Sequence, residues 1–342
     1  MILQPSRRAL LGALACLAGA GLAQPVPAQS AAAQAAFDFI ALGDMPYGPD
    51  LIAGQAYRSL IAQINQLGLP FAIHVGDFKD GKAACSDAEY QLQWQHFQRF
   101  AGALVYTPGD NDWLDCHRRG DEPLERLQAL RQRFFATPQS LGQRPIALQR
   151  QPALMPAHAA YAENQRWQHQ GVVFATVHTV GPRNGFDADS AAVRAEARLR
   201  EAANTAWIAD SFDLARRNGA SALVLATQAE TLDKPNGRGP RRGLVQASFP
   251  SIAHSLLPLA EAASHPVLLV HGDDHDHRHD QPFRNARGEP ITNLWRLQVF
   301  GEPRVHAVRV RVQPGVRQQP FAFTPVWNPM STDPRADPRG NR

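Results

Sequence analysis

The sequence predicts an α/β fold in which parallel strands are joined by crossover helices, and two observations carry this prediction. Strand-like apolar runs alternate with helix-like runs along the first half of the chain, which is typical of strand–helix–strand units. Three of these apolar runs also end in the same dipeptide, Gly-Asp. With 342 residues, 44% of them hydrophobic, the chain can bury the core of one large domain or two small ones.

The expected elements follow one another in a regular order. The segments "AFDFIALGD", "PFAIHVGD" and "ALVYTPGDND" predict buried strands, and the two segments between them, "LIAGQAYRSLIAQINQLG" and "DAEYQLQWQHFQRFAG", have apolar residues at helical spacing. Further strands are predicted at "GVVFATVHTVG", "SALVLATQAE" and "PVLLVHGDDH", with helices around residues 195–220 and at "SIAHSLLPLAEAASH". The runs "NLWRLQVFG" and "VHAVRVRVQP" predict a closing antiparallel pair. Residues 231–248 predict a solvated basic loop, and residues 328–342 a disordered tail.

The first 30 residues predict a targeting segment. A basic start is followed by an apolar stretch and by small residues suited to cleavage, and Arg7-Arg8 resembles a twin-arginine (Tat) export signal. An ordinary secretory signal with two arginines stays open, and in both cases we expect a periplasmic or secreted protein. Removing the leader lowers the net charge from +4 to +2, because it takes two of the 35 basic residues with it. That bias is too small to argue for nucleic-acid or membrane binding, and no second apolar run is long enough to span a bilayer.

Two cysteines, Cys85 and Cys116, remain after the leader is removed. In an oxidising compartment such a pair predicts one disulfide, which would join the loops after the second and third strands. Two separate buried cysteines, or two thiols on a metal, remain as alternatives.

Four predicted strands end in Gly-Asp, which gives Asp44, Asp77, Asp110 and Asp273. The carboxyl ends of parallel strands share one edge of a sheet, and ligands bind there, so we expect these side chains to converge. Carboxylates held close together raise one another's pKa values and resist ionisation. Two divalent cations would supply the missing positive charge, and such a pair binds phosphate oxygens and activates water.

The blocks "GDMPY", "HVGDFKDG", "TPGDNDW", "VLATQAE" and "HGDDH" resemble those of the calcineurin-like metallophosphoesterases, in order and spacing, from about Phe37 to Phe323. The resemblance implies a four-layer α/β/β/α sandwich over residues 36–325. It also implies two bound metal ions and the hydrolysis of a small phosphorylated substrate, a phosphomonoester or phosphodiester, by a hydroxide held between the ions.

The resemblance also assigns roles to residues. Asp44 would bind the first metal and Asp77 would bridge the two. Asn111 stands where the family has a histidine thought to assist the leaving group, so it is a candidate catalytic residue. The metal ligands implied in this way are Asp44, Asp77, Asp110, Gln228, Asp273 and His275.

Several positions depart from the family pattern. The histidine of the first D-x-H motif is replaced by Pro46, and Asn111, Gln228 and Asp273 replace three further histidines. The replacements still offer oxygen atoms, and an oxygen-rich set suits Mn²⁺, Mg²⁺ or Ca²⁺ better than Zn²⁺.

His271 and His178 are candidates to take over the vacated roles. His271 lies two residues before Asp273, on the same face of a strand, and is the first choice for a proton donor. His178 ends a predicted strand and could also reach the site. The loss of histidines motivates an alternative function, a non-catalytic binding or scaffold protein of the periplasm on the same fold.

Overall fold

The computed structural model describes Met1, residues 35–233 and residues 244–331. Apart from Met1, the predicted leader lies outside the described residues, as do residues 234–243 of the basic loop and residues 332–342 of the predicted tail. Among the described residues, no helix is both long enough and apolar enough to cross a membrane. Asn328, at the start of the predicted tail, is buried and donates from its side chain to the carbonyl oxygen of Ala56.

Two sheets face each other, which places the strands in two inner layers. The first sheet has the order β13-β12-β1-β2-β3-β4 and the second the order β10-β11-β9-β8-β7-β6-β5. The strands of the first sheet are β1 (Phe37–Leu42), β2 (Phe71–His74), β3 (Ala103–Tyr106), β4 (Leu141–Gly142), β12 (Ala307–Val312) and β13 (Phe321–Val326). Those of the second are β5 (Gln149–Arg150), β6 (Gln165–His169), β7 (Val172–Thr176), β8 (Ala222–Ala226), β9 (Val267–His271), β10 (Arg278–Asp280) and β11 (Leu294–Gln298).

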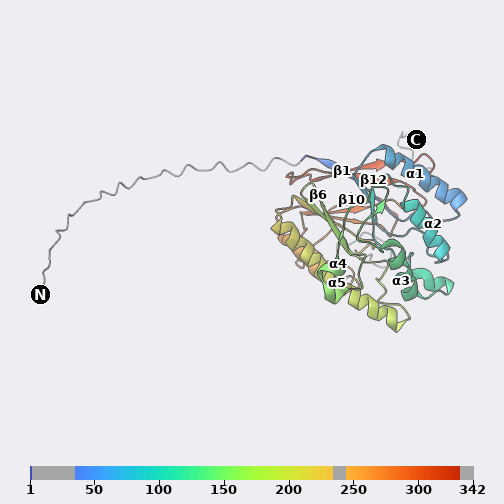
Figure 1. The fold of residues 1–342 in the computed structure, drawn as a ribbon, viewed down its shortest axis with the longest axis horizontal. Coiled ribbons are helices and arrows are strands. Elements are labelled where there is room, and N and C mark those ends of the chain that lie inside the picture. Colours follow the sequence, from blue (N-terminus) through green and yellow to red (C-terminus); the bar gives the residue numbers. More distant parts are fainter. Residues whose placement is uncertain (2–34, 234–243, 332–342) are drawn as a thin grey trace. The chain divides into compact units, whose positions relative to one another are not determined.

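Helices form the two outer layers. On the first sheet lie α1 (Gln55–Gln66), α2 (Asp87–Phe97) and α3 (Pro123–Phe134), which stand together in Figure 1, and on the second lie α5 (Ala191–Arg217) and α6 (Leu257–Ala262). The short α4 (Gln151–Leu154) connects β5 to β6. Short helical segments lie at Asp50–Gly54, Leu114–Arg119, Pro156–His158 and Ile252–Leu256. The predicted four-layer α/β/β/α sandwich is therefore confirmed.

Side-chain alternation along the strands creates three apolar layers. On β1, Phe39 and Ala41 face the core between the sheets, whereas Ile40 and Leu42 face the helices α1 to α3. The same alternation on β9 sends Val270 between the sheets and Leu269 toward α5 and α6. Both sheets are therefore buried on both faces, which explains why their strands are nearly continuous apolar runs.

The predicted antiparallel pairing of "NLWRLQVFG" with "VHAVRVRVQP" is wrong. β11 pairs in parallel with β9, and β12 pairs antiparallel with β1, so the two segments belong to different sheets. Each of them has alternate apolar residues that fill the core between the sheets, Leu297 from one side and Val308 and Val310 from the other. The apolar residues of both segments are buried because the two strands face each other across the core, and the strands do not pair with each other.

The predicted disulfide between Cys85 and Cys116 is confirmed. Their Cα atoms are 5.7 Å apart and both side chains are buried. The bond joins the loop after β2 to the helical turn that follows β3.

Reducing this disulfide should lower the free energy of unfolding by about 3–4 kcal/mol, because the reduced unfolded chain regains the freedom that a loop of 31 residues had lost. Urea unfolding with and without reductant measures the change. The Cys85→Ala/Cys116→Ala variant should show the same loss without reductant. Unchanged unfolding midpoints in both experiments would contradict a stabilising role.

Candidate functional site

The ends of parallel strands from both sheets meet at one edge of the sandwich. β1, β2 and β3 run parallel in the first sheet, and β8 and β9 run parallel in the second. The backbone N–H of Asp273, after β9, donates to Asp44 Oδ1, after β1, at 2.9 Å. Gln228, after β8, reaches Asp77 and Asp110, after β2 and β3. The four Gly-Asp dipeptides are thus brought together, three from one sheet and one from the other.

Two of the four glycines, Gly109 and Gly272, are required by the close approach of a neighbouring aspartate. A Cβ atom on Gly272 would collide with Asp44 Oδ2, and one on Gly109 would collide with Asp77 Oδ1. The aspartates themselves are strained, because Asp44 and Asp77 have φ angles of 53° and 55°. Left-handed backbone is uncommon for residues other than glycine and tends to occur at functional sites.

Asp112 holds the loops after β2 and β3 together. Its carboxylate accepts from the backbone N–H groups of Asp77 (3.0 Å), Phe78 (2.9 Å) and Gly109 (2.8 Å), and from the Tyr106 hydroxyl (2.7 Å). Burial raises the pKa of Asp112 to about 6 despite these donors. With its oxygens used in this way, Asp112 positions Asp77 and is not available as a ligand.

Asp44 and His275 form one half of the site. Asp44 is fully buried, and its Oδ2 atom has no hydrogen-bond partner within the described parts of the chain. His275 Nδ1 lies 2.7 Å from the carbonyl oxygen of Glu302, which assigns the proton to Nδ1 and leaves a lone pair on Nε2. That Nε2 atom lies 3.8 Å from Asp44 Oδ1. The Asp44 carboxylate, which keeps one unpaired oxygen, therefore lies beside an imidazole lone pair.

Tyr47 belongs to this half of the site, and sequence reasoning missed it. Its hydroxyl lies 3.3 Å from Asp77 Oδ2 and 3.4 Å from His275 Nε2, and it accepts from Asn111 Nδ2 at 2.9 Å. The backbone N–H of Asn111 also donates to Asp77 Oδ1 at 3.0 Å. The signal was present in the sequence, since Tyr47 follows Asp44 by three residues within "GDMPY".

Gln228 forms the other half, with Asp77 and Asp110. Its Nε2 atom donates to Asp77 Oδ2 at 3.1 Å and to Asp110 Oδ1 at 2.9 Å. Its Oε1 atom accepts from the backbone N–H of Gly181 at 2.7 Å. The carboxylates of this half therefore meet an amide donor.

The aspartates resist ionisation in this arrangement. Burial raises the pKa values of Asp44, Asp77 and Asp110 well above the ordinary value, and neighbouring carboxylates, Asp273 among them, raise them further. The backbone N–H of Asp273 acts in the opposite direction on Asp44. Positive charge placed in the cluster would favour the ionised carboxylates.

His271, the predicted proton donor, lies at the end of β9. It is buried, and strand alternation places it with Leu269 on the face toward the helices. Its Nδ1 atom lies 3.0 Å from the carbonyl oxygen of Gly272. Its role as a proton donor stays a prediction.

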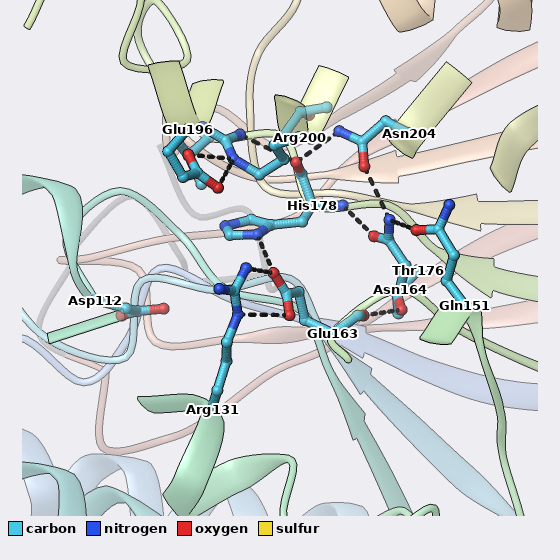
Figure 2. Close-up of polar contacts among 12 residues, drawn as sticks. Asp112, Arg131, Gln151, Glu163, Asn164, Thr176, His178, Glu196, Arg200 and Asn204 are labelled. Atoms are coloured by element: carbon cyan, nitrogen blue, oxygen red, sulfur yellow. Dashed lines mark hydrogen bonds and ion pairs between the residues drawn. The ribbon is translucent and has the colours of Figure 1, made fainter. Parts of the chain in front are cut away.

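His178 is the centre of a buried polar network that fixes the loop after β7 (Figure 2). Its backbone N–H donates to Asn164 Oδ1 at 2.9 Å, and its carbonyl oxygen accepts from Asn204 Nδ2 at 2.8 Å and from Arg200 Nη1 at 3.1 Å. Because Gly181 is in this loop, the network also fixes the N–H group that binds Gln228.

The His178 side chain points toward Glu163 (Figure 2). Its Nδ1 atom lies 2.7 Å from Glu163 Oε1, and Arg131 makes a two-pronged ion pair with the same carboxylate at 2.5 and 3.0 Å. The ring also packs edge-on against Trp113, in the loop after β3. These contacts give His178 a structural role between the two halves of the sandwich.

The donor set fits a metal ion in only one half of the site. Over residues 35–233 and 244–331, no three His, Cys, Asp or Glu side chains are spaced to hold an ion as they stand. Asp44 nevertheless keeps an unpaired oxygen and lies beside the lone pair of His275, and the Tyr47 hydroxyl lies between that lone pair and Asp77, an arrangement that suits a cation. In the Gln228 half, the atom directed at the carboxylates is a donor, which suits no cation.

No protein family and no curated protein matches the chain in sequence. Among solved structures, it is similar to GAP50, the anchor in the inner membrane complex of Plasmodium, with a TM-score of 0.50, 10% identity and 86% of each chain covered. The purple acid phosphatase PPD1 from yellow lupin (Lupinus luteus) gives a TM-score of 0.48 at 10% identity, over 82% of this chain and 50% of that one. A dimetal phosphatase from Danio rerio gives 0.47 at 9% identity, over 85% and 99%. At such identities the likeness to GAP50 concerns the fold alone.

Proposed function

We propose that the chain is an exported, metal-dependent phosphoesterase that hydrolyses a small phosphomonoester or phosphodiester. One observation carries the proposal: a fully buried aspartate, Asp44, keeps an unpaired carboxylate oxygen, and its other oxygen lies 3.8 Å from the His275 nitrogen that carries a lone pair. A buried acceptor without a donor is costly in free energy, and a bound cation offsets that cost. The disulfide between Cys85 and Cys116 is compatible with the export that the leader predicts.

Asp44, Asp77 and His275 would hold the cation. When bound, a divalent ion polarises a phosphoryl oxygen and lowers the pKa of water. Two carboxylates and one imidazole form an oxygen-rich set, which favours Mn²⁺, Mg²⁺ or Ca²⁺. A second ion, as the family resemblance implies, would require Gln228 to turn its oxygen toward Asp77 and Asp110.

Tyr47 and Asn111 would orient the substrate. Burial and the nearby carboxylate of Asp77 raise the pKa of Tyr47 well above its ordinary value, so its hydroxyl keeps its proton and can donate to a phosphoryl oxygen. Asn111 Nδ2, which contacts that hydroxyl, supplies a second donor at the same place. The sequence predicts that His271 donates a proton to the leaving oxygen.

The proposal is tested by assaying the purified protein with generic monoester and diester substrates in Mn²⁺, Mg²⁺, Ca²⁺ and Zn²⁺. We expect hydrolysis that a chelator abolishes and that Mn²⁺ or Mg²⁺ restores. Hydrolysis that continues in the presence of the chelator would contradict the role of the metal. The absence of hydrolysis with each of the four ions would contradict the proposal that the protein is an enzyme.

The contacts of Gln228 favour one other function, a non-catalytic binding or scaffold protein. An amide that donates to Asp77 and Asp110 compensates these carboxylates without a cation. GAP50, which is similar in fold, is described as an anchor. Binding of a phosphorylated ligand without turnover, to a protein that takes up no metal on reconstitution, would support this function over hydrolysis.

A further inference from the structure

We infer that the side-chain amide of Gln228 replaces the second cation of the site, so that the chain binds one divalent ion, held by Asp44, Asp77 and His275. This inference rests on the proposed metal-dependent function and adds the number and place of the ions. It departs from the two-ion arrangement that the family resemblance implies.

The orientation of the amide is determined from both of its ends. Gln228 Nε2 lies between Asp77 Oδ2 (3.1 Å) and Asp110 Oδ1 (2.9 Å), where its two hydrogens meet two acceptors. Gln228 Oε1 accepts from Gly181 N–H at 2.7 Å. Turning the amide over would set its NH₂ group against an N–H donor and its oxygen against two carboxylates. An oxygen directed at a cation is therefore disfavoured by the protein itself.

The backbone around the amide is equally constrained. The N–H of Gln228 donates to the carbonyl oxygen of Thr179 (3.3 Å), and its carbonyl oxygen accepts from the N–H of Gly272 (3.0 Å). On the other side, Gly181 lies against the carboxylate of Asp273, with which a Cβ atom at this position would collide.

The loop that carries Gly181 is fixed from α5. The N–H of Val180 donates to Asn184 Oδ1 at 3.1 Å, and Arg200, fully buried, donates to that same oxygen and to the carbonyl oxygen of Asn184. The network around His178 holds the start of the same loop (Figure 2). The donor that orients Gln228 is thus built into the fold.

The two halves of the site differ for this reason. In the Gln228 half, Asp77 and Asp110 already have a donor between them, and Asp273 Oδ2 accepts from the backbone N–H of Glu230 at 2.9 Å. In the other half, Asp44 Oδ2 is unpaired within the described chain. In the Gln228 half an entering cation would have to displace the two hydrogen bonds of the amide, whereas beside Asp44 it would meet an unpaired oxygen.

The number of bound ions tests the inference. The purified protein is dialysed against Mn²⁺, and bound metal is measured by elemental analysis and by electron paramagnetic resonance, which separates single ions from coupled pairs. We expect one uncoupled Mn²⁺ per chain. The variants Gln228→His and Gln228→Glu replace the amide by a ligand, and each should raise the count to two, with a coupled signal.

Gln93→His is the matched control. Gln93 is also buried and also donates to a carboxylate, that of Glu89 at 2.8 Å, but it lies on α2. Its replacement should leave the count at one. Two ions in the unmodified protein would overturn the inference, and so would a count of one in folded Gln228→His and Gln228→Glu.

Hydrolysis measured on the same samples separates this inference from the proposed function. Two ions with metal-dependent hydrolysis would refute the role of Gln228 and leave the enzyme standing. One uncoupled ion without hydrolysis of any substrate would support the role of Gln228 and refute the enzyme. No bound ion in the unmodified protein would refute both.

Discussion

Replacing Asp77 by asparagine should reduce kcat/KM for phosphoester hydrolysis by roughly 10³-fold or more. Asp77 is the residue that both halves of the site share, because Tyr47, Asn111 and Gln228 all donate to its carboxylate. Removing its charge weakens the cation site, and a bound metal contributes several kcal/mol to the stabilisation of a phosphoryl transition state, where 1.36 kcal/mol is tenfold in rate. Steady-state kinetics at saturating Mn²⁺ measure the loss.

Asp80→Asn provides the control for this experiment. Asp80 lies in the same loop, three residues further on, and its carboxylate accepts from the backbone N–H of Lys82. That variant should retain the activity of the unmodified protein. Comparable rates for Asp77→Asn and Asp80→Asn would contradict a catalytic site at the strand edge.

Replacing Glu163 by glutamine should lower the free energy of unfolding by about 3–5 kcal/mol. Glu163 is fully buried and binds Arg131 and His178 (Figure 2). Removing one partner of a buried ion pair leaves the other charge uncompensated, which is strongly destabilising. Urea unfolding at pH 7 measures the difference.

The difference in the free energy of unfolding between the unmodified protein and Glu163→Gln should also depend on pH. Burial alone would raise the pKa of Glu163, but the charge of Arg131 and the hydrogen bond from His178 outweigh it and hold this pKa well below its ordinary value of 4.5. A lowered pKa contributes stability that is fully present above the unfolded value and is lost as the pH falls. The gap between the unmodified protein and Glu163→Gln should therefore narrow as the pH falls below about 4.5.

Glu125→Gln is the matched control on the surface. Glu125 also pairs with an arginine, Arg126, but its side chain is 57% exposed. Exposed ion pairs contribute at most about 1 kcal/mol. An equal loss of stability in both variants, or a gap that does not change with pH, would contradict the assigned role of Glu163.

Much of the fold follows from local patterns in the sequence. The alternation of apolar runs predicts the parallel strands and their helices, because it depends on neighbours along the chain. The disulfide is predicted because only two cysteines remain after the predicted leader. The partners of β11 and β12 could not be predicted in this way. Both strands have apolar residues at alternate positions. Which strand each one pairs with depends on how the two sheets pack against each other.

For the site, too, the sequence pattern predicts which residues meet but not how their side chains are oriented. Gly-Asp at successive strand ends predicts that the aspartates meet, because parallel strands end at one edge. The identity of Gln228 does not say which end of its amide faces them, since glutamine offers both an acceptor and two donors. That choice depends on Gly181, which the chain brings to Gln228 from 47 residues away.

Anomalous X-ray scattering from crystals of the Mn²⁺-loaded protein tests the metal site most directly. The expected result is one anomalous peak within bonding distance of Asp44 Oδ2, the Asp77 carboxylate and His275 Nε2, with Gln228 still bound to Gly181. A peak between Asp110 and Gln228, or a fully active crystal sample with no peak beside Asp44, would contradict the site derived from the orphaned carboxylate oxygen.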